Sequence, residues 1–188
     1  MSGRLGAVGG PGGPFLGYEG RPNAVKNFLA DQPRRLGTDY IDIYRRSRVE
    51  PSVPIEETGG AIAEMITRGY VRYVGLSGYR GRRTEGAIGI LRALGTPLLI
   101  HQPSYSMLNR WIEPDLLDVV GAEGVGVIAF SPLAQGLLTD KYLGGTPEDS
   151  RVRRGQAFDA GLLREANGAR RQALPSMPAA AGTQRATR

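Results

Sequence analysis

Four short runs of apolar residues, separated by longer stretches of mixed polarity, punctuate the middle of the chain. They occupy residues 40–44, 71–76, 98–101 and 125–130, so successive runs begin 31, 27 and 27 residues apart. This interval holds one strand, one helix and two connections, which is the repeating unit of parallel α/β proteins. The four runs are therefore predicted to be parallel strands of one sheet.

Apolar residues at helical spacing predict a helix in each intervening stretch. One spans about 54–68 and begins with a proline and two glutamates, which favour a helix N-terminus. Two more are expected over 84–94 and, shorter, over 113–121, each followed or closed by glycine. Another apolar stripe, within 25–36, precedes the first strand, and Pro33 is expected to interrupt or kink that helix.

Near-continuous apolar strands that alternate with amphipathic helices indicate a parallel sheet covered by helices. Both a (β/α)8 barrel and an open doubly wound sheet fit this pattern, and periodicity does not distinguish them. In either fold the functional residues follow the carboxyl ends of the strands. Attention therefore falls on residues 44–48, 77–79, 101–105 and 130–136.

The two ends of the chain differ in composition from its middle. Residues 1–20 contain eight glycines and no regular apolar spacing, and residues 168–188 are mostly Ala, Arg, Gln, Pro, Thr and Ser. Both ends are expected to be disordered, which leaves residues 21–167 as one α/β domain.

Charge and residue usage exclude several classes of function. The net charge of +6 comes from the ends, because residues 37–163 carry fourteen basic and fifteen acidic groups. A nucleic-acid partner is therefore not indicated. The chain has no cysteine and a single histidine, His101, which argues against disulfides, cysteine nucleophiles and a metal site. With no apolar stretch of about 20 residues and no signal peptide, a cytoplasmic protein without membrane contact is expected.

Phosphate-binding patterns of the common kinds are absent from the sequence. Neither GxGxxG nor GxxxxGK[ST] follows a predicted strand. The best candidate for a phosphate cradle is 130–142, where a strand end is followed by small residues, a glycine and Lys141. A plain turn between a strand and a helix, with a solvated lysine, fits the same residues.

Six blocks of sequence, in order, resemble the aldo-keto reductases, and in particular the branch of bacterial glyceraldehyde 3-phosphate reductases and potassium-channel β subunits. The resemblance implies NADPH as cofactor and a (β/α)8 barrel, of which the four predicted strands would be the fourth to seventh. A partial barrel is then expected, with two open edges that invite self-association. The blocks are 36–44, 54–58, 69–77, 101–105, 108–111 and 129–142.

The resemblance also assigns cofactor contacts. Gln102 would bind the nicotinamide amide beside Ser77, and Phe130 would stack on the nicotinamide ring. His101 is interpreted as a core residue, while Tyr105 and Trp111 would either face the substrate or only pack. The loop residues expected to wrap the pyrophosphate, largely through backbone amides, are Ser131, Leu133, Gln135 and Gly136. The residues expected at the phosphates are Lys141, Ser150 and Arg151.

The catalytic residues are where the chain departs from the family. Relatives use a Tyr general acid, tuned by Lys and Asp, with a His at the end of the fourth strand. The first three belong to strands that would precede residue 20, and nothing in 1–20 resembles those strands; Ser47, followed by Arg48, stands at the His position. The expected function is NADPH-dependent reduction of a small aldehyde such as glyceraldehyde 3-phosphate, impaired by truncation. A noncatalytic NADPH-binding regulatory subunit and an inactive remnant are the alternatives.

Overall fold

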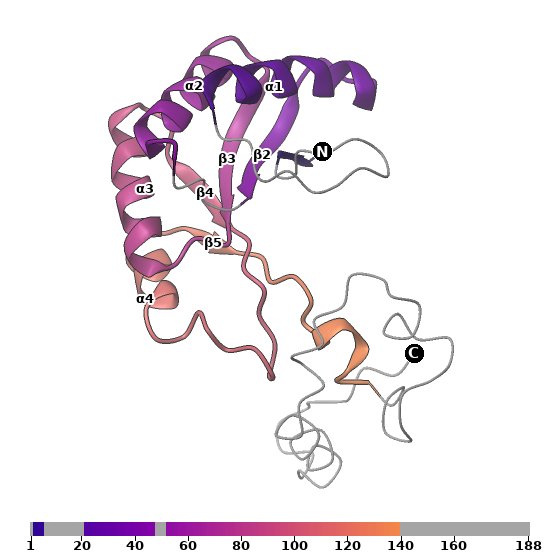
Figure 1. Cartoon of the computed structure of the whole chain (residues 1–188), viewed down its shortest axis with the longest axis vertical. Coiled ribbons are helices and arrows are strands. Elements are labelled where there is room, and N and C mark those ends of the chain that lie inside the picture. Colours follow the sequence, from indigo (N-terminus) through magenta and orange to yellow (C-terminus); the bar gives the residue numbers. More distant parts are fainter. Residues whose placement is uncertain (1, 6–20, 48–51, 140–188) are drawn as a thin grey trace, which may run out of the picture. The chain divides into compact units, whose positions relative to one another are not determined.

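The computed structural model describes residues 2–5, 21–47 and 52–139, whose core is a five-stranded parallel sheet (Figure 1). The described chain falls into two compact units, one within 1–103 and 112–128, the other within 104–111 and from 129 onward. The strands are β1 (Ser2–Leu5), β2 (Ile41–Ser47), β3 (Val71–Ser77), β4 (Leu98–His101) and β5 (Gly126–Val127). The helices are α1 (Pro22–Leu36), α2 (Ile55–Thr67), α3 (Gly81–Ala93) and α4 (Leu116–Ala122), with a short 3-10 turn at Ala134–Gly136.

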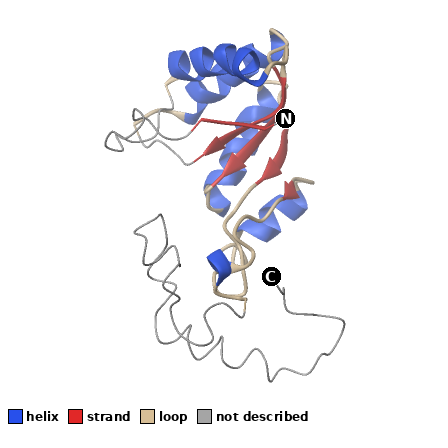
Figure 2. Cartoon of the chain, turned by 90° about the vertical axis from the view of Figure 1, so that its right-hand side faces the viewer, coloured by secondary structure: helices blue, strands red, loops and turns tan. Residues whose placement is uncertain are grey.

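Strand order resolves the choice that periodicity leaves open. The strands lie in the order β1-β2-β3-β4-β5 and every neighbouring pair is parallel. Because crossovers between parallel strands are right-handed, a sheet whose order never reverses carries all its helices on one face. Figures 1 and 2 show this arrangement, with the helices on one side of the strands. A doubly wound sheet requires a reversal, so the fold is part of a (β/α)8 barrel, as predicted.

The core lies between the sheet and its helices. Strand register places Arg46, Leu76 and His101 in one row across β2, β3 and β4, and all three are buried. In the neighbouring row Tyr44 pairs with Val74, and the Tyr44 ring lies 6.3 Å from that of Phe28 in α1, which identifies this as the helix-covered face. We call Arg46, Leu76 and His101 the buried row.

Two strands differ from the sequence prediction. The strand β1 forms at Ser2–Leu5, where residues 1–20 were expected to be disordered, and it pairs with Ile43–Arg46. Pairing at a sheet edge uses backbone groups, so it needs no apolar alternation. The run 125–130 forms only the two-residue strand β5. The last contact of this run with β4 is the hydrogen bond from the Ile128 amide to the His101 carbonyl, and from residue 129 the chain belongs to the second unit.

The helix α1 runs through Pro33 without ending there, which corrects the expected interruption. Pro33 lies in the last turn, so its missing N–H removes a single helical hydrogen bond, and its ring is buried. The helix ends three residues later at Leu36, and its C-cap, Gly37, takes the left-handed conformation with φ +65°. The Thr38 amide then donates to the Pro33 carbonyl at 3.0 Å and closes the helix end.

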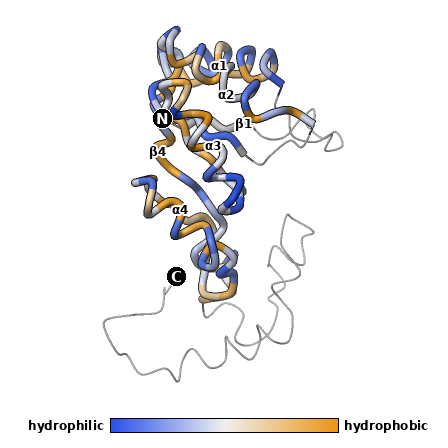
Figure 3. The backbone as a smooth tube through the Cα atoms, turned by 90° about the vertical axis from the view of Figure 1, so that its left-hand side faces the viewer, coloured by the Kyte–Doolittle hydropathy of each residue, from blue (hydrophilic) through white to orange (hydrophobic). Residues whose placement is uncertain are grey.

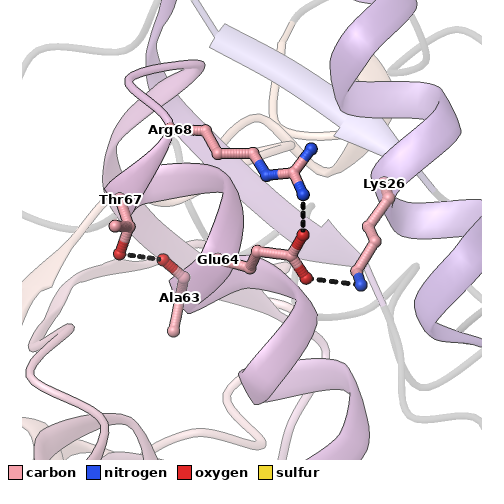
Figure 4. A network of polar contacts seen from close by, with 5 residues as sticks. All are labelled: Lys26, Ala63, Glu64, Thr67 and Arg68. Atoms are coloured by element: carbon pink, nitrogen blue, oxygen red, sulfur yellow. Dashed lines mark hydrogen bonds and ion pairs between the residues drawn. The ribbon is translucent and has the colours of Figure 1, made fainter.

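An ion-pair network ties α1 to α2 on the outer surface (Figure 4). The Glu64 carboxylate of α2 receives Lys26 of α1 on one oxygen and Arg68 on the other, the latter at 2.6 Å. The hydrogen bond from Lys26 is the main reason why the pKa of the Glu64 carboxyl lies below its usual value. Figure 3 shows how hydrophobic and hydrophilic positions alternate along these helices. None of the helices in the described residues is long and apolar enough to cross a membrane.

Candidate active-site edge

The carboxyl ends of β2, β3 and β4 bring three of the predicted site residues to one edge of the sheet. Ser47, the last residue of β2, pairs in register with Ser77, the last residue of β3. The Ser77 hydroxyl donates to the backbone carbonyl of Gln102 at 2.7 Å. The backbone amide of Gln102 donates to the backbone carbonyl of Leu76, also at 2.7 Å. Ser47, Ser77 and Gln102 therefore follow one another across adjacent strands, where a barrel places its chemistry.

The Ser77–Gln102 pair has the donor set of a carboxamide site. The Ser77 side chain is buried, and because its hydrogen is committed to a carbonyl, its oxygen remains an acceptor. Gln102 is half-buried and its side chain offers one acceptor and two donors. An amide such as that of nicotinamide needs both a donor and an acceptor opposite it, which these two residues can supply.

Behind this edge, the helix-covered face holds a cluster of buried polar side chains. His101 is fully buried, and burial lowers its pKa to about 4, so the imidazole is neutral near pH 7. Burial also raises the pKa values of the Tyr44 and Tyr79 phenols, while the nearby positive charge of Arg46 opposes both shifts. The prediction that His101 is a core residue is confirmed.

The sequence singled out segments 44–48 and 77–79, but the burial of the Arg46 and Tyr79 side chains in this cluster was not predicted. Arg46 is only 2% exposed and Tyr79 only 4%. The burial of Arg46 could have been inferred from its position in the strand, because it lies two residues after Tyr44 and so on the same face of β2. For Tyr79 the signal was a large aromatic residue two positions after the end of β3, in the short loop before α3.

In the second unit, Phe130 lies beside the segment 104–111. Phe130 forms an isolated bridge with Ser104, its carbonyl accepts the Tyr105 amide at 3.2 Å, and its side chain is 43% exposed. The Trp111 indole N–H donates to the Ser104 carbonyl at 2.8 Å. This bond fixes the indole against segment 104–111, and both roles expected for Trp111 stay predictions, whereas the Phe130 ring keeps an exposed surface on which a planar group can stack.

The loop that follows Phe130 has an unusual backbone. The backbone φ angles are positive at Ser131, Ala134 and Gln135, with values of 56°, 48° and 59°. Residues other than glycine rarely adopt this region. The amides of Ala134 and Gly136, and of the next two leucines, donate to carbonyls of the same loop. These four amides are therefore already used, and a phosphate at this loop would need other groups.

Side chains in the same loop add one acceptor. The Gln135 side-chain oxygen is buried and has no hydrogen-bond partner, and the neighbouring Leu133 is 40% exposed. A buried oxygen of this kind suits a hydroxyl donor and does not suit a phosphate. The remaining predicted contacts, Arg48, Lys141, Ser150 and Arg151, lie outside the described residues, as does the Ser47 side chain.

The predicted site is divided between the two units. Ser77 and Gln102 belong to the first, and Phe130, Ser131, Leu133, Gln135 and Gly136 belong to the second. Each half is consistent within itself, one as a carboxamide-binding edge and the other as an exposed ring followed by a strained loop. Within the described residues, no group of three His, Asp or Glu side chains could hold a metal ion.

A family model and several known proteins match this chain. The aldo/keto reductase family model matches residues 15–181. L-glyceraldehyde 3-phosphate reductase of Escherichia coli K12 is 47% identical over 143 residues, which are 76% of this chain and 41% of that protein. "Probable voltage-gated potassium channel subunit beta" of Arabidopsis thaliana is 37% identical over 148 residues, 76% of this chain and 44% of that protein. The chain thus spans about two fifths of the length of these relatives.

A solved structure agrees with the fold. The glycerol dehydrogenase of Gluconobacter oxydans superposes with a TM-score of 0.70 at 23% identity, over 90% of this chain and 50% of that one. The family model matches residues 15–181, which extend beyond both ends of the interval 21–167 expected for the domain. The domain boundaries at 21 and 167 therefore stay a prediction. With its parallel sheet in barrel order and a family match over most of its length, the chain belongs to the aldo/keto reductase family.

Proposed function

We propose that this chain binds NADPH with the nicotinamide at the carboxyl edge of β3 and β4, and that it takes part in the reduction of a small carbonyl compound such as glyceraldehyde 3-phosphate. The observation that carries the proposal is the Ser77–Gln102 pair, hydrogen-bonded at 2.7 Å where two adjacent barrel strands end. The sequence similarity to L-glyceraldehyde 3-phosphate reductase supports the substrate class. When bound, NADPH would supply the hydride.

The residues would divide the binding work by their chemistry. In the first unit, Gln102 would donate to and accept from the nicotinamide amide, with the Ser77 oxygen as a further acceptor. In the second unit, the exposed Phe130 ring would offer a surface on which a planar group can stack. The side-chain oxygen of Gln135 would accept a hydrogen bond from a ribose hydroxyl rather than contact a phosphate, because this buried oxygen has no donor. Lys141 and Arg151 would neutralise charge on the phosphates, and Ser150 would donate a hydrogen bond to them.

Proton transfer is the weak point of this site. Ser47 ends β2 beside Ser77, at the position where the family has His, and a serine hydroxyl does not titrate near neutral pH. It can donate a hydrogen bond to a carbonyl oxygen but is a poor general acid. We therefore expect cofactor binding with slow turnover.

The test measures binding and turnover separately. A thermal melt of the full chain should shift upward on addition of NADPH, because a ligand that binds only the folded state stabilises it. Gln102→Leu should abolish most of that shift, while the matched control Gln32→Leu, on the outer helix α1, should leave it unchanged. No shift with the unaltered chain would contradict the proposal. NADPH oxidation with glyceraldehyde 3-phosphate then reads turnover.

A noncatalytic, NADPH-binding role is the second candidate, and Ser47 is the observation that favours it. The melting temperature of such a protein would rise with NADPH, but the protein would not oxidise NADPH in the presence of substrate. Ser47→His would not create NADPH oxidation either. Measurable turnover by the unaltered chain would exclude this candidate.

We also propose that the sheet supports self-association. Among the strands of the described residues, β1 and β5 each have a neighbour on one side only, and on the face opposite the buried row Tyr73 is 51% exposed. An open edge of this kind pairs readily with a second chain. Light scattering after size-exclusion chromatography should then give more than the 20.2 kDa of one chain, and a purely monomeric mass would contradict it.

A further inference from the structure

The end of β4 is tied to the loop after β3 from both faces of the sheet. In the plane of the sheet the Gln102 backbone amide donates to the Leu76 carbonyl, and on the face of the proposed site the Ser77 hydroxyl donates to the Gln102 backbone carbonyl, each at 2.7 Å. On the helix-covered face, Nε2 of His101 lies 3.2 Å from the Tyr79 carbonyl oxygen. We call these bonds between 76–79 and 101–102 the β3–β4 clasp.

The chemistry of the clasp fixes the state of the histidine. A carbonyl oxygen only accepts, so Nε2 must carry the hydrogen and donate it to Tyr79. Nδ1 is then bare, and in the described structure it is buried without a hydrogen-bond partner. The ring is neutral, since its burial disfavours the charged form. His101 is thus a donor held in one tautomer against one carbonyl.

The loop held by this donor is short and is fixed at both ends. Only three residues separate β3 from α3, and the first of them, Gly78, has φ +75°. At the far end Gly81 lies against Asp115, where a Cβ would come within 2.7 Å of the carboxyl carbon. The Tyr79 carbonyl lies between these points, so its position sets the direction of the chain that leaves Ser77.

We propose that His101 is a positioning residue for the nicotinamide end of the cofactor site. It would not touch the cofactor; it holds Tyr79, which keeps Ser77 in register with Gln102. The inference rests on the proposed NADPH binding. It predicts a loss confined to the nicotinamide end of the cofactor, whereas a purely structural role predicts a general loss of folding or of all binding.

The experiment compares two ligands on the full chain: NADPH, and 2′-phospho-ADP-ribose, which lacks the nicotinamide. His101→Leu removes the donor, and we expect NADPH affinity to fall roughly threefold to tenfold, as for one lost hydrogen bond, with that of 2′-phospho-ADP-ribose unchanged. His101→Gln, whose amide N–H can reach the same carbonyl, should retain most of the NADPH affinity. Equal loss for both ligands overturns the positioning role alone. Absence of binding of either ligand to the unaltered chain overturns the proposed function, and the positioning role with it.

A second measurement needs no variant, because the chain has a single histidine and its ring signals need no assignment. In a long-range ¹H–¹⁵N spectrum of the unaltered protein we expect the hydrogen on Nε2. We expect the ring signals to shift with NADPH but not with 2′-phospho-ADP-ribose. A hydrogen on Nδ1, or a ring that responds equally to both ligands, overturns the proposal even if His101→Leu does not fold.

Discussion

Replacing His101 with leucine should make the free energy of unfolding less dependent on pH. The pKa of His101 is about 4 in the folded chain, where the ring is fully buried, against an ordinary value of 6.5. As the pH falls below 6.5, the unfolded chain binds a proton at this histidine and the folded chain does not. Folding stability from this group is therefore complete above pH 6.5 and is lost as the pH falls toward 4.

The magnitude follows from the difference between the two pKa values. Since one pKa unit corresponds to about 1.4 kcal/mol, the loss is about 2 kcal/mol at pH 5 and about 3 kcal/mol once the pH is below 4. This is a large fraction of the roughly 5–15 kcal/mol that stabilises a typical domain. The unaltered chain should thus become much easier to unfold in weak acid.

The assay is urea denaturation of the unaltered chain and of His101→Leu from pH 7.5 to pH 5, at constant ionic strength. Carboxylates titrate alike in both proteins, so the difference between their free energies of unfolding isolates the histidine. That difference should change by about 2 kcal/mol across this range, in favour of the variant at low pH. A difference that stays constant with pH would refute the reasoning, as would a measured histidine pKa near 6.5.

Further predictions concern packing and the ion-pair network. Gly75→Ala should destabilise the chain by about 1–3 kcal/mol, because the new Cβ would lie 2.9 Å from Cγ1 of Ile100. Its control, Gly86→Ala in the open on α3, should stabilise by about 0.5–1 kcal/mol, and equal effects of the two would contradict the packing argument. Glu64→Gln should lower the melting temperature at low salt by removing the bridge between α1 and α2 (Figure 4). The loss should shrink in 1 M NaCl, and one independent of salt would contradict an electrostatic role.

The central strands could be predicted from the sequence because each is a short apolar run, even though one face of the sheet stays open, with Tyr73 51% and Leu99 39% exposed. The run 98–101 coincides with β4, and 71–76 falls one residue short of β3. Strand order could not be predicted, since it depends on which strands pair and not on their spacing. The barrel arrangement was accessible only through the family resemblance, which the order of the strands then confirmed.

Elements held by backbone pairing or by position within a helix were harder to predict. The strand β1 has little apolar character and forms through its register with β2. Pro33 is tolerated in α1 because it falls in the last turn, a boundary effect that residue type alone does not reveal. Likewise, Gln102 could be named as a site residue, but the bond between the Ser77 hydroxyl and its backbone carbonyl is a consequence of strand register.

The buried row and the proposed site share the ends of the same three strands. Arg46, Leu76 and His101 are each followed by a site residue, Ser47, Ser77 and Gln102 in turn. Successive residues of a strand point to opposite faces but share one backbone, so we expect a change in the row to shift the backbone that carries the site. Stability and cofactor binding at this edge are therefore coupled through shared backbone. A substitution in the buried row that alters folding stability should therefore also alter cofactor binding. In the outer helices, by contrast, stability can change without a change in cofactor binding.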